Sequence, residues 1–261
     1  MTSQTMKDIR RIISLWNVVP YVLVLVVAGS LLTGCGGRPT DKTRSRGAVG
    51  AGEVTMQPVG KDARQPAICV ITIDGTRSYQ FLERAKQTAA AVIRALPGAS
   101  KVFVRWITED SESDRCAIVS VLLPPDPIKP KNPYAKHLRE RYHQQQDHNR
   151  QIRERMIAHM VQATSPNAGR TDVWGTLLAA AERFDNSPSL RPMVILLTDM
   201  VDNVGKRPTR LTLSGMTVQI MGFQVDGGTA ERKAWWIERL TERGAVSVTF
   251  THLDEVFIVA Q

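Results

Sequence analysis

The residues of this sequence that could do chemistry are oxygen donors placed where apolar runs end. The first are Asp74, Thr76 and Ser78, which follow directly on the apolar run 67–73. A near-continuous apolar run of this length predicts a strand buried on both faces, and residues just past it lie at the ligand-binding edge of an open α/β sheet. One carboxylate and two hydroxyls suit Mg²⁺ or a similar hard cation. The same residue types are also common in turns and helix caps.

Two later stretches supply matching donors. Thr171 precedes a predicted helix, and Asp199 follows the apolar run 193–198. Because the carboxyl ends of parallel strands share one edge, all five side chains could meet there. The set holds no Cys or His, which favours a hard divalent cation, Mg²⁺ or else Mn²⁺ or Ca²⁺, over zinc. Mg²⁺ needs few protein oxygens, so an external ligand can complete its shell.

The elements that would position these residues alternate along the chain. Strands are predicted at 67–73, 101–107, 117–123, 193–198, 217–223 and 246–251, and helices at 79–96, 134–164, 170–184 and 230–243. This order predicts an α/β, doubly wound, mostly parallel sheet. The short connection 109–114 implies an antiparallel hairpin and hence one antiparallel edge strand. Its acidic residues could bind Ca²⁺, but they lack the ordered spacing of a calcium loop, so a solvated turn is the expected interpretation.

The helix predicted at 134–164 is an unusually polar insertion. Its apolar stripe is narrow and interrupted at 144–149, so its middle should project from the body or lie across its surface. Arg150, Arg153 and Arg155 could bind an acidic partner or a membrane surface, and a solvated helix face is the alternative. The histidines of this segment are not spaced to share one helix face and predict no metal site.

The N-terminal part indicates export and anchoring. Residues 1–34 combine a basic start with an apolar stretch and predict a signal peptide. Leu32-Thr33-Gly34-Cys35 resembles the lipobox of bacterial lipoproteins, which implies lipidation of Cys35. An uncleaved transmembrane anchor is the alternative. Residues 35–65 predict a flexible tether and 66–261 the folded domain. Either interpretation predicts a membrane-anchored domain in the cell envelope, on the outer membrane or periplasmic side if the cell is Gram-negative.

Composition narrows the partners. The chain of 261 residues has a net charge of +9, and the three cations and one anion of residues 1–34 account for two of these charges. The remaining +7 favours anionic surfaces, but no aromatic-and-basic motif predicts nucleic-acid binding, and no feature indicates a small-molecule substrate. Cys69 and Cys116 lie on or beside strands that are not expected to be neighbours, so both are predicted to be buried free thiols.

The pattern of donors resembles the von Willebrand factor A (vWA) domain with its metal-ion-dependent adhesion site (MIDAS). The resemblance covers residues 66 to the end, with Asp74, Thr76 and Ser78 after the first strand, Thr171 before a helix and Asp199 after the fourth strand. It implies that Thr76 and Ser78 bind the metal directly, that the two aspartates act partly through water, and that Thr171 joins or leaves with conformational state. An acidic side chain of a partner protein would fill the open position.

Two positions beside this motif depart from the family. Thr76 replaces a Ser, which keeps the hydroxyl but adds a methyl group. Met200 replaces a Gly, and the larger side chain of Met200 could crowd the metal. Arg77 and Trp174 flank the predicted site and could shape a partner-binding rim, although packing or solvation explains them equally.

Three classes of function follow from these residues. The leading hypothesis is a membrane-tethered binding protein that uses its metal to hold another protein. The second is a metal-free scaffold that binds through the basic helix. The third is a hydrolase, since Asp74-Gly75-Thr76 resembles part of the haloacid dehalogenase phosphatase motif. That motif needs a nucleophilic Asp at position 72, where this chain has Thr72, so we expect no enzyme activity.

Overall fold

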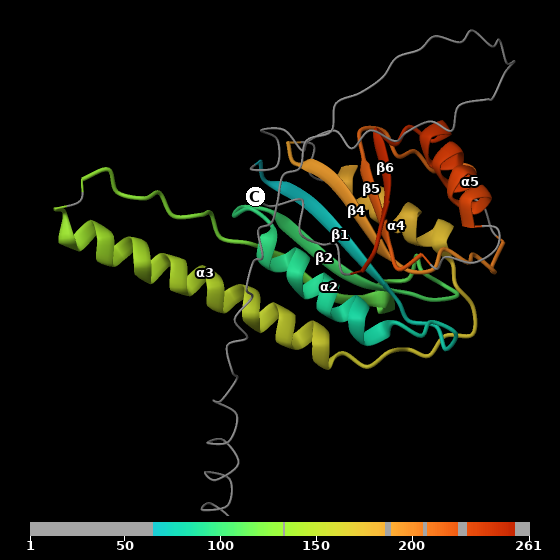
Figure 1. Cartoon of the computed structure of the whole chain (residues 1–261), viewed down its shortest axis with the longest axis horizontal. Coiled ribbons are helices and arrows are strands. Elements are labelled where there is room, and N and C mark those ends of the chain that lie inside the picture. Colours follow the sequence, from blue (N-terminus) through green and yellow to red (C-terminus); the bar gives the residue numbers. More distant parts are fainter. Residues whose placement is uncertain (1–64, 133, 186–188, 206–207, 224–228, 254–261) are drawn as a thin grey trace, which may run out of the picture. The chain divides into compact units, whose positions relative to one another are not determined.

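The fold is built on one twisted sheet, seen in a computed structural model that describes residues 65–132, 134–185, 189–205, 208–223 and 229–253 (Figure 1). Its strands are β1 (Ala67–Asp74), β2 (Lys101–Ile107), β3 (Ala117–Leu122), β4 (Arg191–Leu197), β5 (Thr217–Met221) and β6 (Ser247–Thr251). They lie in the order β3-β2-β1-β4-β5-β6. All neighbours are parallel except β2 and β3, so β3 is the predicted antiparallel edge strand and the predicted fold class is confirmed.

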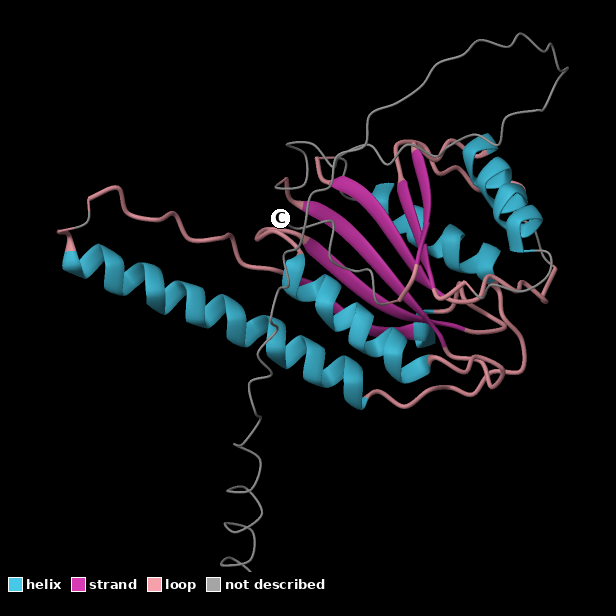
Figure 2. Cartoon of the chain, in the orientation of Figure 1, coloured by secondary structure: helices cyan, strands magenta, loops and turns pink. Residues whose placement is uncertain are grey.

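Helices cover both faces of the sheet (Figure 2). The helices α2 (Leu82–Ala95) and α3 (Lys136–Gln162) lie on one face, and α4 (Val173–Asp185) and α5 (Thr229–Glu242) on the other. All residues of β1 are buried, as its apolar sequence predicts. Its alternate side chains Cys69 and Ile71 enter the core beneath α2 and α3, whereas Ile68 and Val70 enter the core beneath α4 and α5.

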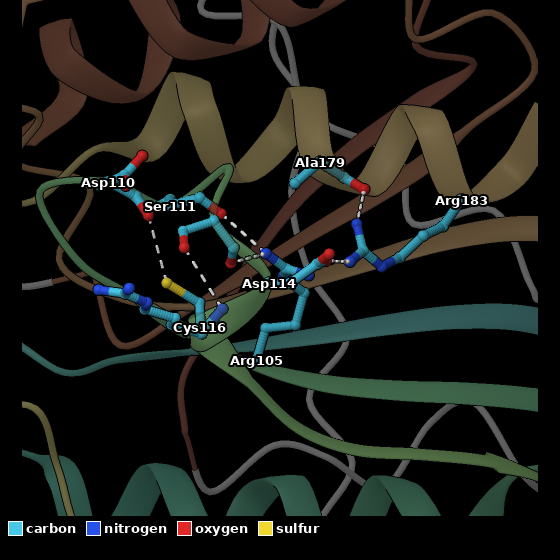
Figure 3. A network of polar contacts seen from close by, with 9 residues as sticks. Arg105, Asp110, Ser111, Asp114, Cys116, Ala179 and Arg183 are labelled. Carbon is cyan, nitrogen blue, oxygen red and sulfur yellow. Dashed lines mark hydrogen bonds and ion pairs between the residues drawn. The ribbon is translucent and has the colours of Figure 1, made fainter.

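The antiparallel hairpin closes around a buried arginine (Figure 3). The Nη2 of Arg105 on β2 donates to the carbonyl oxygens of Ser111, at 3.0 Å, and Ser113, at 2.8 Å. Arg183 of α4 forms an ion pair with Asp114 at 3.2 Å. The loop carbonyls therefore bind a guanidinium, and the acidic side chains of the loop are exposed, which agrees with the solvated turn rather than the Ca²⁺ alternative.

Both cysteines of this part of the chain are buried and free. Cys69 on β1 and Cys116 next to β3 are separated by β2, as the predicted sheet order requires. Burial raises the pKa of the Cys69 thiol to about 12. Both cysteines therefore belong to the apolar interior.

The long helix α3 has 27 residues and two distinct halves. Its second half packs on α2 and β3 through Met156, Ile157 and Met160. None of the described residues in its first half, 136–148, is buried, and this half extends beyond the sheet (Figure 1). The prediction that part of this helix is exposed is therefore correct, but the exposed part is the N-terminal half and not the middle of the helix.

The predicted partner-binding role of Arg153 on α3 is wrong. Arg153 is 12% exposed and donates through Nη2 to the carbonyl of Leu96 at 2.8 Å, which ties α3 to the end of α2. Arg150 is exposed but is paired with Asp147 at 2.8 Å, and Arg155 is exposed. Arg153 is therefore a structural residue.

The sheet and both cores lie within one unit of the chain, Thr55–Gln261. A segment with its own hydrophobic cores on both faces of a complete sheet has what an independently folding domain requires. Its first strand begins at Ala67, next to the predicted domain start. The predicted signal peptide, Cys35 and the tether 35–65 lie outside the described residues. Among the described residues, no helix has the length and apolarity to cross a bilayer.

Candidate metal centre

The predicted site lies where β1 and β4 end side by side. Asp74 is the last residue of β1 and is 1% exposed, and Thr198 and Asp199 follow β4, which runs parallel to β1. The hydroxyl of Thr198 donates to Oδ2 of Asp74 at 2.8 Å. Asp199 is partly exposed, and its Oδ1 accepts from the backbone N–H of Val201 at 3.0 Å. Both aspartates thus belong to the carboxyl edge of the sheet.

The loop after β1 folds back on Asp74. The backbone N–H and the hydroxyl of Thr76 donate to Oδ1 of Asp74, at 3.0 and 2.7 Å. Because the Thr76 proton points at Asp74, the oxygen keeps lone pairs for another ligand. Ser78 is exposed, and its hydroxyl forms a hydrogen bond with Oγ1 of Thr76, with the two oxygens 3.2 Å apart. Neighbouring oxygens around octahedral Mg²⁺ lie about 3 Å apart, so this pair fits two adjacent ligand positions.

Backbone pairing holds this loop against the loop that precedes α4. Ala168 donates to the carbonyl of Gly75 at 3.1 Å, and Arg77 donates to the carbonyl of Ala168 at 3.1 Å. At Gly75 a Cβ atom would lie 2.8 Å from Cγ of Pro166, so this close approach requires glycine.

The Thr171 loop is joined in turn to the loop after β4. The N–H of Thr171 donates to Oδ1 of Asn203 at 2.7 Å, and the N–H of Asn203 returns a bond to the carbonyl of Thr171 at 3.1 Å. Thr171 is 2% exposed, and both of these hydrogen bonds to Asn203 are made by its backbone. The three predicted stretches therefore form one connected set of loops.

The electrostatics of this edge favour a cation. Burial raises the pKa of Asp74, the nearby charge of Asp199 raises it further, and the hydrogen bonds from Thr76 and Thr198 oppose this rise. Burial, followed by the charges of Asp74 and Asp199, likewise raises the pKa of Tyr79 above its usual value. A divalent cation reverses the preference for neutral carboxyl groups at such a site. The residues present therefore fit a hard divalent metal.

Two residues of this centre escape prediction from sequence. Thr198 bonds directly to Asp74, and its only signal is a hydroxyl residue immediately before Asp199 at the end of a predicted strand. Tyr79 follows Ser78 and is 6% exposed, and its buried hydroxyl has no partner among the described residues. A Cβ atom at Gly222 would lie 2.6 Å from that hydroxyl, so the loop after β5 passes directly against it.

Two predictions about the rim are wrong. Trp174 is 2% exposed and packs on Trp236 with ring centroids 5.0 Å apart, so it belongs to the core. Met200 is also 2% exposed and lies in the core between α4 and α5, so its side chain does not crowd the site. Arg77 remains at the surface, where its Nε donates to the carbonyl of Asn167 at 3.0 Å.

The donor set is built on hydroxyls and two aspartates. Within the part of the chain that the structure describes, no group of three or more His, Cys, Asp or Glu residues is placed to hold a metal. The hydroxyls of Thr and Ser residues would have to supply the further ligand oxygens, so metal binding at Asp74 stays a prediction.

Comparison with family models and with curated proteins gave no match. Among solved structures, proximal thread matrix protein 1 from the mussel byssus is similar, with 16% identity and a TM-score of 0.44 over 74% of this chain and 45% of that one. A von Willebrand factor type A protein from Catenulispora acidiphila gives 17% identity and a TM-score of 0.43 over 72% and 39%. The ArnB paralog VWA2 from Sulfolobus acidocaldarius gives 13% and 0.44 over 75% and 44%.

This chain thus spans less than half the length of each of these structures. All three TM-scores lie below 0.5, and the fold assignment follows from the order and direction of the strands.

Proposed function

We propose that this domain is a vWA-like binding module that holds a partner protein through a divalent cation. The observation that carries the proposal is the pair of hydroxyl oxygens of Thr76 and Ser78, 3.2 Å apart at the sheet edge, beside the buried carboxylate of Asp74. Thr171 and Asp199 would complete the set of protein donors. Because Ser78 is exposed, a bound cation would face solvent and keep a position open for a partner.

Each residue has a distinct part in this proposal. Asp74 fixes the Thr76 hydroxyl by accepting a hydrogen bond from it, and the carboxylates of Asp74 and Asp199 would supply the negative charge that attracts the cation. Mg²⁺, or Mn²⁺ or Ca²⁺ in its place, would supply the coordination bond to an acidic side chain of the partner. Arg77, exposed next to Ser78, would attract the same acidic group.

A binding role is favoured over hydrolysis by the residue two positions before Asp74. Thr72 is fully buried in β1, and its hydroxyl donates to the carbonyl of Ile195 at 3.2 Å. The position that would need a nucleophilic carboxylate is therefore occupied by a packed hydroxyl inside the sheet. We accordingly propose no enzyme activity.

The predicted lipid at Cys35 and the tether 35–65 would hold this module on a membrane of the cell envelope. This part of the proposal rests on the sequence of residues 1–35 alone. We expect the full chain to incorporate a radioactive fatty acid and the Cys35→Ser variant to incorporate none. Equal labelling of the parent and the variant would contradict lipidation at this residue.

Titration calorimetry of Mg²⁺ and Mn²⁺ into the unit Thr55–Gln261 tests the metal site. We expect saturable binding that is abolished in Asp74→Asn and weakened at least ~10-fold in Ser78→Ala. Asp110→Asn, an exposed aspartate of the hairpin loop, is the matched control and should bind as the parent does.

Ser78 is exposed, so Ser78→Ala should not disturb the fold, and circular dichroism checks this. Absence of saturable binding by the parent unit, or full binding by Ser78→Ala, would contradict the proposed site. If metal binding holds, a glutamate-rich peptide should bind only in its presence.

A further inference from the structure

The exposed end of α3 and the segment leading into it form a separate feature of the molecule. We call residues 124–132 and 134–148 the distal arm, which comprises the described connector after β3 and the first half of α3 (Figure 1). None of these residues is buried. At 1.5 Å per residue, the helical part 136–148 is about 20 Å long. Asn149, which is buried, holds the base by donating to the carbonyl of Pro125 at 2.9 Å.

The distal arm carries a concentration of uncompensated positive charge. The described part of the distal arm has five Lys or Arg residues and three acidic residues, of which Asp126 is paired with Arg153 at 3.9 Å and Asp147 with Arg150 at 2.8 Å. Glu140 lies 3.9 Å from Lys136. The other four cations are exposed and have no ion-pair partner among the described residues; they are Lys129, Lys131, Arg139 and Arg141.

The second half of α3 differs in this respect. There Arg150 is paired with Asp147 at 2.8 Å, and Glu154 is paired with Arg94 of α2 at 2.8 Å. Arg153 donates to the carbonyl of Leu96, whereas Arg155 is exposed and has no ion-pair partner among the described residues. Of the five uncompensated Lys and Arg residues along the connector and α3, four therefore lie in the distal arm.

Large apolar side chains are exposed among these cations. Ile128 is 92% exposed, Tyr134 is 90% exposed and Leu138 is 41% exposed. A single exposed apolar residue needs no explanation. Three of them on one basic projection form the pattern by which proteins enter the headgroup layer of a membrane, with cations on phosphates and apolar or Tyr side chains below them.

We propose that the distal arm docks on an anionic phospholipid surface. Its four free cations would bind lipid phosphates, and Ile128 and Tyr134 would enter the headgroup layer. An acidic protein would account for the cations but not for the exposed apolar side chains. The proposal does not depend on the metal site.

The base of the arm lies at the edge of the sheet where the described chain begins. The connector is fixed to the edge of the sheet where β1 begins, because Asp126 accepts from the N–H of Gly98 at 2.7 Å and Ala67 donates to Ser100 at 3.0 Å. The first strand, β1, begins at this same edge, so the base of the arm and the start of the described chain lie at one end of the domain.

Vesicle flotation with the unit Thr55–Gln261, which lacks the apolar N-terminal segment, tests this inference. We expect binding to vesicles of phosphatidylcholine with one third phosphatidylglycerol, and little binding to pure phosphatidylcholine. Each surface cation contributes about 1 kcal/mol, so Lys129→Gln/Lys131→Gln should weaken binding about 25-fold. Arg115→Gln/Arg210→Gln, which removes two exposed cations from the body, is the matched control and should bind nearly as the parent does.

Insertion is tested with a polarity-sensitive fluorophore attached at Ile128→Cys, with Val246→Cys, 73% exposed on the body, as control. We expect a blue shift on anionic vesicles for the arm label alone. Equal binding to both vesicle types, or equal loss in the arm and body variants, would overturn the proposal. Arm-dependent binding to poly-L-glutamate without a blue shift on vesicles would also overturn it, since that result indicates an acidic protein partner.

Discussion

Thr198 offers the sharpest test of how the candidate metal centre is held together. It is fully buried, donates to Oδ2 of Asp74 at 2.8 Å and accepts from the N–H of Met200 at 3.1 Å. Thr198→Val keeps the shape of the side chain and removes both hydrogen bonds. Thr72→Val is the matched control, because Thr72 is equally buried, lies in β1, and donates only to the backbone carbonyl of Ile195.

The expected cost follows from the two lost hydrogen bonds. A hydrogen bond to a charged group contributes about 1.5–3 kcal/mol, and leaving a buried N–H unpaired costs about 1–3 kcal/mol. We therefore expect Thr198→Val to lower the free energy of unfolding by about 4 kcal/mol at pH 7, or the Tm by roughly 10 °C for a domain of this size. Thr72→Val should cost about 1 kcal/mol.

The pH dependence of this loss identifies Asp74 as the group concerned. The pKa of Asp74 is raised in the folded domain, so its ionised form opposes folding, and that penalty grows as pH rises through the raised pKa. Thr198 limits the rise by bonding the carboxylate, and its removal should raise the pKa further. The deficit of Thr198→Val relative to the parent should therefore shrink as pH falls below the raised pKa.

Urea unfolding of the parent and both variants at pH 7 and at pH 4, in the presence of a chelator, measures these differences. If Thr198→Val lowers the free energy of unfolding by less than about 1 kcal/mol, the reasoning is refuted, because the bond to Asp74 would then not stabilise the domain. A deficit that is the same at both pH values would refute the assignment to the Asp74 carboxylate.

Three further outcomes are expected. Gly222→Ala should destabilise the domain by about 2 kcal/mol or more, because Gly222 has φ +94° and an added Cβ would lie 2.6 Å from the Tyr79 hydroxyl. Tyr79→Phe should stabilise the domain by about 1 kcal/mol, because it removes a buried hydroxyl without a partner among the described residues. The double variant should recover part of the loss in thermal unfolding. Met200→Gly should lower stability by about 1–3 kcal/mol in urea unfolding, because the lost buried side chain outweighs relief of its φ of +61°. Cys69 and Cys116 should resist a disulfide-exchange reagent at pH 8 in the native unit and react together in denaturant, since both are buried and the Cys69 pKa is about 12; rapid native reaction would contradict this.

The sheet could be predicted from sequence because its central strands are apolar on both faces. The run 67–73 has no polar position other than Thr72, and the structure buries all of it. The antiparallel edge followed from a connection too short to cross the sheet. Such local patterns carry most of the information about which segments form which elements.

Features that depend on distant contacts were not predictable in the same way. The hydrogen bond between Thr198 and Asp74 joins residues 124 positions apart, and no sequence pattern near Thr198 predicts it. Arg153 and Arg150 look equivalent on a helical projection, but only Arg153 faces the carbonyl at the end of α2. Trp174 adjoins the predicted site in sequence, yet helix α4 turns it into the core against Trp236.

The two proposed binding features lie at opposite ends of α3. Its C-terminal end leads within a few residues to Ala168, which bonds to Gly75 in the loop of the candidate metal centre. Its N-terminal end is the distal arm, and 27 residues of helix separate these ends by about 40 Å. With the arm on a membrane, the edge that carries Ser78 and Arg77 would therefore face away from the lipid. The predicted tether alone would leave the orientation of the domain free, whereas a second contact through the arm would fix it and present the candidate metal centre to a partner.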